Sequence, residues 1–302
     1  MKKQNYKQDL FGLKICSRDS VEMFYPKTRD SDQAVMKCNR SGVIFLSESK
    51  KNKNDYKNKR GHAKLSSDST QDGIVNREIF MNSFFKQRDV QRRASFIEPL
   101  VENKRWIDIG TGSGGILDEL SKTARIINGI ELQDDLREIL NERGYDTYET
   151  VYDLPPNKLY DVVSMFHVFE HLVNPIDDLK QIFSKLDVGG KIVIEIPHAR
   201  DFLLSILECE SFKRRHFWSE HLILHTRYSI ECFLRSVGFN NIVTKGIQRY
   251  PLSNHLHWLS KNKPGGHIKW KFLETDNLDA EYELLLSSLD VTDTLMIIGE
   301  KS

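Results

Sequence analysis

A glycine-rich turn between a short apolar segment and a helical segment constrains the fold of this chain more than any other feature. The segment RWIDIG (105–110) predicts a buried strand, and DIGTGSGG (108–115) leads from it into a segment of helical periodicity. Gly110, Gly112 and Gly115 fit the pattern G-x-G-x-x-G, in which glycines let the backbone turn sharply and approach a ligand closely. The turn therefore predicts a fold that binds a nucleoside.

Strand and helix patterns alternate along most of the remaining chain. The predicted strands are RWIDIG, RIINGIE (125–131), YETV (148–151), YDVVSM (160–165), KIVIEIP (191–197), NNIVTKGIQ (240–248) and VTDTLMIIGEK (291–301). Amphipathic segments separate them, such as PIDDLKQIFSKL (175–186). This alternation predicts an α/β fold with a doubly wound, mostly parallel, seven-stranded sheet that helices cover on both faces. Such sheets bind ligands at the carboxyl ends of their strands.

The residues before this pattern predict a small β-containing accessory segment. Two strand-like stretches, at 21–26 and 35–46, precede a stretch at 49–73 that is rich in Lys, Asn, Ser and Asp. That composition predicts an exposed, flexible, basic linker. The expected parts of the chain are the accessory segment with its linker (1–75) and the main domain (76–302), with cap insertions on the acceptor side at about 200–225 and 249–290.

Charge and cysteine usage exclude several classes of protein. The 302 residues include 44 basic and 43 acidic side chains, so no global field draws in nucleic acid or an anionic membrane. The N-terminal residues have no apolar core of a signal peptide, and no apolar run reaches membrane-spanning length. No C-x-x-C occurs, and Cys16 and Cys38 alone cannot complete a zinc ribbon. We therefore expect a cytoplasmic protein with free thiols and no membrane insertion.

An acidic residue downstream of the glycine turn indicates which nucleoside ligands are compatible. Glu131 ends the second predicted strand, about where a carboxylate binds the two hydroxyls of a ribose. NAD and S-adenosylmethionine both suit this layout. Asp108 favours S-adenosylmethionine, because it precedes the first glycine by two residues and can meet the cationic methionine amine. The strand at 160–165 that leads directly into HVFEHLVNP also favours S-adenosylmethionine.

Four motifs together resemble those of class I S-adenosylmethionine-dependent methyltransferases. DIGTGSGG, GIEL, YDVVSMFHVFEHLVNP and LDVGGKIVIEIP occur in the order and at the spacing of that superfamily, and the resemblance covers about residues 100–245. It implies a Rossmann-like methyltransferase fold, S-adenosylmethionine as the cofactor and a methyltransferase activity. The residues that the resemblance assigns to the cofactor are Asp108, Gly110, Thr111, Gly112, Glu131, Leu132, Asp153 and Met165.

The motif HVFEHL (167–172) contains H-x-x-E-H, with His167, Glu170 and His171. Zinc proteases use such a motif on a long helix, but here it follows a predicted parallel strand and Pro175 lies close by, which argues against proteolysis. We favour acid–base chemistry, in which His167 removes the proton of an acceptor hydroxyl. We expect His171 and His221 to assist in catalysis.

Two other interpretations of this motif stay open. His167, Glu170 and His171 could bind a divalent metal that lowers the pKa of the acceptor hydroxyl. Here the chain resembles the ubiquinone-pathway O-methyltransferases, which have E-x-x-E-H at this place. His167 replaces their first glutamate, and the smaller number of oxygen ligands weakens the case for Mg²⁺. A metal is therefore not favoured. In the third interpretation, Glu170 and His171 only cap and brace a helix.

Two segments rich in aromatic residues and histidines interrupt the α/β pattern. FKRRHFWSEHLILHT (212–226) contains Trp218 and His221, and QRYPLSNHLHWLSKNKPGGH (248–267) contains Tyr250. An aromatic ring can stack on the apolar face of a sugar while histidines bind its hydroxyls. The residues that we expect to contact the acceptor are Phe166, His167, Trp218 and Tyr250.

The overall pattern, including YPKTRDSD (25–32), resembles bacterial methyltransferases associated with surface-polysaccharide assembly. The resemblance implies a sugar or nucleotide-linked sugar as the acceptor, that is, a small molecule or glycan precursor. One alternative is an O-methyltransferase of a small aromatic or quinone-like acceptor. Another is a non-catalytic module that binds S-adenosylmethionine. The balanced charge argues against a nucleic-acid substrate, and the sequence leaves the oligomeric state open.

Overall fold

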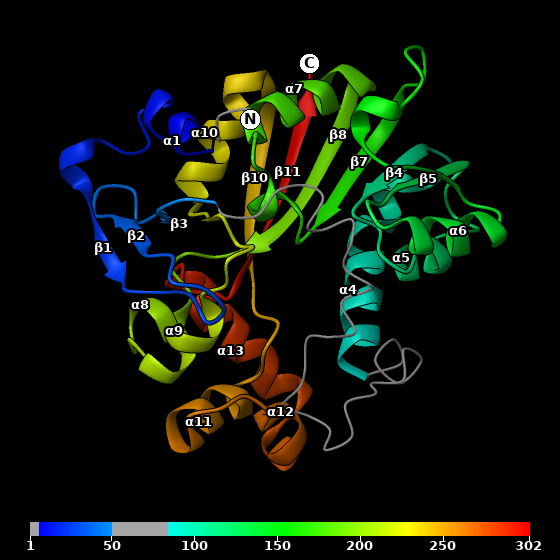
Figure 1. The fold of residues 1–302 in the computed structure, drawn as a ribbon. Coiled ribbons are helices and arrows are strands. Elements are labelled where there is room, and N and C mark those ends of the chain that lie inside the picture. The colour runs from blue at the N-terminus through cyan, green and yellow to red at the C-terminus, as the bar shows by residue number, and fades with distance from the viewer. Residues whose placement is uncertain (1–5, 50–83) are drawn as a thin grey trace. The chain divides into compact units, whose positions relative to one another are not determined.

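The computed structural model describes residues 6–49 and 84–302 (Figure 1). Seven strands form one sheet in the order β10-β11-β8-β7-β4-β5-β6. These strands are β4 (Arg105–Ile109), β5 (Ile126–Ile130), β6 (Asp146–Tyr148), β7 (Tyr160–Phe166), β8 (Leu186–Pro197), β10 (Phe239–Ile247) and β11 (Thr294–Lys301). β4 pairs in parallel with β5 and with β7, and β5 pairs in parallel with β6. The predicted fold class, an α/β fold with a mostly parallel seven-stranded sheet, is confirmed.

Helices connect most of these strands. The α-helices are α1 (Tyr6–Gly12), α4 (Phe84–Val101), α5 (Gly115–Glu119), α6 (Asp134–Glu142), α7 (Pro175–Lys185), α8 (Phe202–Ser205), α9 (Glu210–His216), α10 (Arg227–Val237), α11 (Leu252–Lys261), α12 (Gly266–Lys269) and α13 (Asp276–Ser288). Helix α10 begins where the Thr226 side chain accepts the N–H of Ser229, and it ends at Gly238, whose φ is 107°. Within 6–49 and 84–302, no helix is long and apolar enough to cross a membrane.

The chain divides into two compact units. Unit 1 comprises residues 1–51, 167–180 and 194–300, and unit 2 comprises 52–166, 181–193 and 301–302. In unit 2 the central strands β4 and β7 are almost fully buried, and Trp106 donates a hydrogen bond to Ser164 at 2.8 Å. This burial explains why the parallel strands are nearly continuous apolar runs in the sequence.

Unit 1 contains a four-stranded sheet in the order β1-β2-β3-β9. Its strands are β1 (Val21–Tyr25), β2 (Val35–Cys38), β3 (Ile44–Leu46) and β9 (Ile223–Leu224), and successive neighbours pair antiparallel. The predicted strand at 35–46 is a hairpin, because the chain reverses through a turn at Gly42, whose φ is 74°. The N-terminal segment therefore shares a sheet with residues from the first predicted insertion. Most of the predicted linker lies outside the described residues.

Two predicted strands have different bounds in the structure. The strand predicted at 148–151 lies earlier, at Asp146–Tyr148, because Thr150 caps a 3-10 helix, η3 (Val151–Asp153), by accepting the N–H of Tyr152. The strand predicted at 191–197 begins five residues earlier, since β8 runs through the predicted DVGG turn. In the two regions predicted as insertions, 200–225 holds α8, α9 and β9, and 249–290 holds helices α11 to α13.

Candidate functional site

The glycine turn after β4 has the backbone conformation that a close ligand requires. Gly110, Gly112 and Gly114 have φ values of 73°, 57° and 80°, in the left-handed region that favours glycine. The N–H groups of Gly110 and Thr111 donate to the carbonyl of Ile130, at 2.7 and 3.1 Å, and so fix the turn to the end of β5. A Cβ added at Gly112 would meet no atom of the described residues within 4 Å. The turn is therefore held in place and open beside Gly112.

The third glycine of the predicted G-x-G-x-x-G has a packing role. Gly115 begins α5, and a Cβ there would approach Cγ2 of Val90 in α4 to 3.2 Å. At the preceding Gly114, a Cβ would clash with Cδ2 of Leu140. The sequence pattern could not separate the glycines that open the turn from those that let helices pack closely.

The carboxylate of Glu131 is fixed beside the glycine turn. Its Oε2 accepts the N–H of Gly112 and its Oε1 accepts the N–H of Gln133, both at 2.9 Å. Burial raises the pKa of Glu131 above its ordinary value, although these amides act in the opposite direction. Each carboxylate oxygen has a second lone pair, which remains suitable for a hydroxyl donor. This geometry suits the predicted ribose-binding role.

Asp108 is the last acceptor of a buried hydrogen-bond chain in unit 2. Its Oδ1 accepts the hydroxyl of Ser164 at 2.5 Å, and Ser164 in turn accepts the indole N–H of Trp106. Burial raises the pKa of Asp108 to about 7, although the hydrogen bond from Ser164 acts in the opposite direction. A cationic ammonium group near this carboxylate would favour its charged form.

Asp108→Asn should change how stability depends on pH. The folded protein holds a proton on Asp108 up to about pH 7, whereas the unfolded chain releases it near pH 4, so rising pH across this window destabilises the wild type. The asparagine variant lacks this proton. Between pH 5 and pH 8 it should therefore gain about 1–3 kcal/mol of stability relative to the wild type. Urea unfolding at both pH values measures this, and parallel pH profiles for the two proteins would contradict it.

The remaining predicted cofactor residues lie in unit 2. Met165 is buried in β7, and Leu132 is half-buried after Glu131. Asp153 is exposed, and its Oδ2 accepts the N–H and the hydroxyl of Thr150 at 2.9 and 2.7 Å. This carboxylate caps η3, and its role next to the adenine stays a prediction. Phe166, predicted to face the acceptor, is half-buried under the guanidinium of Arg93, 5.2 Å from the ring centroid.

His167 follows β7 directly and lies between two buried carboxylates of unit 1. Its φ is 56°, which is uncommon for a residue other than glycine and marks positions held by their surroundings. Nδ1 lies 3.2 Å from Glu170 Oε1, and Nε2 lies 3.2 Å from Glu195 Oε1. Arg249 Nη1 is 3.1 Å from the same Nε2. Both ring nitrogens therefore have charged neighbours that fix the imidazole.

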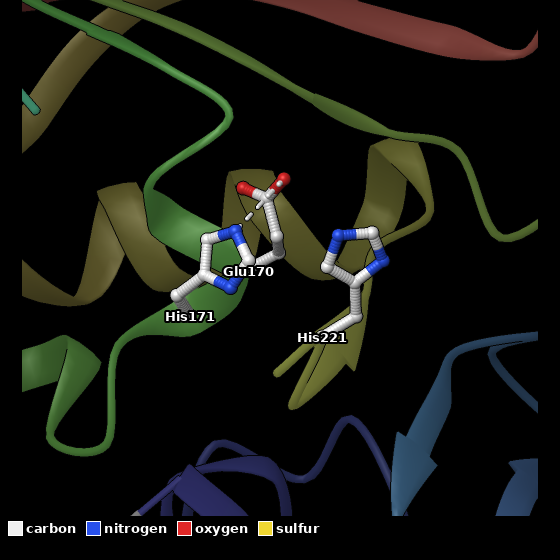
Figure 2. Close-up of side chains that lie close together, drawn as sticks. All are labelled: Glu170, His171 and His221. Carbon is white, nitrogen blue, oxygen red and sulfur yellow. Dashed lines mark ion pairs between the residues drawn. The ribbon is translucent and has the colours of Figure 1, made fainter. Parts of the chain in front are cut away.

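His171 and His221 lie on either side of Glu170 (Figure 2). Glu170 and His171 belong to the 3-10 helix η4 (Phe169–His171), and His221 precedes β9. Each of the three residues offers a ligand atom within 4.8 Å of the other two. The structure therefore brings together His171 and His221, two predicted catalytic residues from distant parts of the sequence.

The charges of this cluster are set by burial and by the close contacts. Burial alone raises the pKa of Glu170, but the hydrogen bond from His167 and the electrostatic influence of His171 and His167 hold that pKa below its ordinary value. Burial lowers the pKa of His221 well below its ordinary value. At neutral pH the cluster thus places an ionised carboxylate near a neutral imidazole.

The residues predicted to bind the acceptor are only partly brought together. Trp218 is half-buried, and its ring packs edge to face on His221 and on His171, with centroids 5.3 and 6.2 Å apart. The ring of Tyr250 instead packs on His267, at 5.6 Å. Arg249, the residue before Tyr250, contacts His167. Trp218 therefore packs on the pair of His171 and His221, whereas Tyr250 follows Arg249 in the sequence, the residue that contacts His167.

Sequence reasoning missed Glu195, Arg249 and Arg29 as candidate site residues. Glu195 could have been found, because it is the one charged residue in the apolar run IVIEIP of β8. The carbonyl of Glu195 also accepts the N–H of His167, at 2.8 Å. Arg29 lies 4.7 Å above the Trp218 ring. No local sequence pattern predicts that Arg29 or Arg249 belongs to the site, because only the fold brings these residues to the cluster.

The comparisons with known proteins agree with this geometry. Residues 81–244 match the family model for a methyltransferase domain, and this match covers more than half of the chain. The chain therefore belongs to this methyltransferase family, and the predicted class I superfamily is confirmed. S-adenosylmethionine is the cofactor of these enzymes, and the fixed Glu131 and the open space at Gly112 fit it.

Solved structures share the fold at low sequence identity. A SAM-dependent methyltransferase of Thermotoga maritima, described as a possible histamine N-methyltransferase, matches with a TM-score of 0.50 and 18% identity, covering 74% of this chain and 95% of its own. A SAM-dependent methyltransferase of Archaeoglobus fulgidus matches with a TM-score of 0.50 and 17% identity, covering 75% of this chain and all of its own. These matches support the fold alone.

Two curated relatives are ubiquinone biosynthesis O-methyltransferases. The one from Hydrogenovibrio crunogenus is 26% identical over 131 residues, which are 39% of this chain and 54% of that protein. The mitochondrial one from Candida albicans is 26% identical over 109 residues, which are 32% of this chain and 33% of that protein. The chain thus spans between a third and about half of the length of these relatives.

Proposed function

We propose that this protein transfers the methyl group of S-adenosylmethionine to a hydroxyl of a sugar or nucleotide-linked sugar used in surface-glycan biosynthesis. The observation that carries the proposal is the position of His167. It directly follows β7, has a left-handed backbone conformation and is flanked by the buried carboxylates of Glu170 and Glu195. A histidine fixed in this way at the end of a central strand suits proton transfer from an acceptor hydroxyl.

The neighbours of His167 indicate how it would accept the proton. With Nδ1 protonated and donating to Glu170, Nε2 has the lone pair, and Arg249 Nη1 lies within donating distance of it. In the proposed reaction, the acceptor hydroxyl takes the place of Arg249 at Nε2 and passes its proton there. The carboxylates of Glu170 and Glu195 then stabilise the imidazolium. Bound S-adenosylmethionine would supply the electrophilic methyl group and would leave as its demethylated thioether.

Trp218 supports a ring-shaped acceptor. It is half-buried, it packs edge to face on His171 and His221, and Arg29 lies over its ring, so that an aromatic ring is surrounded by polar groups. Such a surface suits a sugar ring, which has an apolar face and hydroxyl groups on its edge. We propose that Phe166 and Tyr250 complete the contacts with the acceptor.

A small aromatic or quinone-like hydroxyl acceptor is the second candidate. The two relatives named as ubiquinone biosynthesis O-methyltransferases favour it. Trp218 could stack on an aromatic ring as well as on a sugar. Both candidates share the hydroxyl nucleophile and the base, and they differ only in the ring that the site receives.

A mass-spectrometric screen distinguishes the two acceptors. The protein is incubated with S-adenosylmethionine and either sugar nucleotides and glycan precursors or hydroxylated aromatics. We expect a methylated product from the sugar set and none from the aromatic set. Products from the aromatics alone would replace the sugar proposal with the second candidate. Cofactor binding without product from either set would support a non-catalytic binding module.

Trp218→Ala should weaken use of the acceptor and spare the cofactor. Loss of stacking should lower kcat/KM for the acceptor by about 1–3 kcal/mol, while the affinity for S-adenosylmethionine stays within about threefold. Phe272→Ala, which removes a ring that is 79% exposed on another helix-rich segment, is the matched control and should change neither. Steady-state kinetics and calorimetry on the same variants measure both quantities. Loss of cofactor affinity with an unchanged acceptor KM would remove Trp218 from the acceptor site.

A further inference from the structure

We propose that Glu170, His171 and His221 bind one divalent cation of the zinc class. The three residues supply two imidazole nitrogens and one carboxylate oxygen, and their ligand atoms lie within 4.8 Å of one another (Figure 2). This set differs from the one considered from the sequence, because His221 takes the place of His167. The proposal concerns metal binding and does not depend on the acceptor proposed above.

The hydrogen bond of His171 fixes which of its nitrogens faces Glu170. Nδ1 lies 2.7 Å from the backbone carbonyl of Glu220, so Nδ1 is the protonated nitrogen and donates to that oxygen. In the neutral form of His171, Nε2 has the lone pair, and it lies 3.9 Å from Glu170 Oε1. That nitrogen and the neighbouring carboxylate can together bind one cation. Metal-binding histidines are commonly oriented by such a bond from their other nitrogen.

The two oxygens of the Glu170 carboxylate have different surroundings. Oε1 is 3.2 Å from His167 Nδ1 and accepts its proton in a hydrogen bond. Oε2 is buried and has no hydrogen-bond partner among the described residues, and the residue is only 1% exposed. Leaving a buried carboxylate oxygen unsatisfied is costly, and a bound cation removes that cost. His167 would then orient the carboxylate without binding the metal.

His221 supplies the third ligand from a distant part of the sequence. Its Nδ1 is buried and has no hydrogen-bond partner within the part of the chain that the structure describes. The loop that holds it is fixed to η4 twice: Leu222 N–H donates to the Glu170 carbonyl at 2.8 Å, and His171 Nδ1 donates to the Glu220 carbonyl. The two ligand-bearing segments are thus joined on both sides of the cluster.

The ligand atoms favour zinc over magnesium. Zn²⁺ commonly binds imidazole nitrogen and carboxylate oxygen at about 2.0–2.2 Å, with three protein ligands and one open position. Mg²⁺ requires mostly oxygen ligands in an octahedron. Bonds of this length need donors closer than 4.8 Å, so binding would draw the side chains together by about 1 Å.

Calorimetric titration of Zn²⁺ alone into the untagged, chelator-treated full chain tests the proposal. The wild type should bind one equivalent of Zn²⁺ and show no comparable heat with Mg²⁺. His221→Ala and Glu170→Gln should each weaken binding by about 100-fold or more. His257→Ala is the matched control, because its Nδ1 contacts the Lys263 carbonyl and it lies outside the cluster. Its affinity should equal that of the wild type.

X-ray absorption of the zinc-loaded protein should show two imidazole ligands and no sulfur ligand. Thermal unfolding in the absence of metal shows whether the variants are folded. Folded His221→Ala and Glu170→Gln variants that keep wild-type affinity would overturn the proposal. Sulfur ligands would overturn it as well, since they would place the metal on cysteines. A wild-type protein that binds no zinc, or binds magnesium equally well, would also contradict it.

Discussion

His167→Ala should lower kcat by about 100-fold or more, while the affinity for S-adenosylmethionine changes by less than about threefold. The reason is that the variant removes the proton acceptor from between Glu170 and Glu195 but leaves the glycine turn of unit 2 intact. Steady-state kinetics with the identified acceptor and calorimetry with the cofactor measure the two effects.

A second substitution separates the base from a structural role. His167 has a φ of 56°, and asparagine adopts this conformation more readily than most residues do. His167→Asn therefore keeps the backbone and a side-chain hydrogen bond but cannot act as the base. It should lose as much turnover as the alanine variant. If the asparagine variant stays near wild-type turnover, His167 positions the cluster and another group accepts the proton.

Glu131→Ala should weaken S-adenosylmethionine binding by about 1.5–3 kcal/mol, because the variant removes charge-assisted hydrogen bonds to the ribose. It also removes the acceptor for the N–H groups of Gly112 and Gln133, which hold the turn. Calorimetry measures the affinity. Glu142→Ala, at an exposed position of α6, is the control and should bind as the wild type does.

The comparison of Glu131→Gln with Glu131→Ala separates these two contributions. Glutamine can still accept a backbone N–H, but it lacks the negative charge that favours the ribose hydroxyls. We therefore expect glutamine to retain the fold and to lose most of the affinity. An affinity for S-adenosylmethionine equal to that of the wild type in both variants would exclude Glu131 from the cofactor site.

The parts of the fold that could be predicted are those set by local patterns. The order of strands and helices follows from apolar periodicity, and the glycine turn and Glu131 lie only 21 residues apart in DIGTGSGGILDELSKTARIINGIE, counted from Gly110 to Glu131. The bounds of the short strand β6 were harder to predict, because Thr150 and Asp153 form a capping box and the residues after Thr150 form a 3-10 helix. Side-chain capping of this kind competes with strand formation.

The arrangement of the cluster could be predicted only in part. HVFEHL placed His167, Glu170 and His171 close together because they are neighbours in the sequence. The contact between His171 and His221 depends on the loop before β9, which the N-terminal sheet holds through the pairing of β3 with β9. Arg249 reaches His167 across 82 positions of sequence. Long-range pairings such as these have no periodic signal in a single sequence.

The most direct test of the account is calorimetric titration of the wild-type protein with S-adenosylmethionine and, separately, with NAD. The left-handed glycines, the open space at Gly112 and the fixed carboxylate of Glu131 predict one S-adenosylmethionine site with a micromolar Kd, roughly 7–8 kcal/mol of binding free energy. NAD should give no binding heat in the same range. Binding of NAD without any binding of S-adenosylmethionine would contradict the account at its centre.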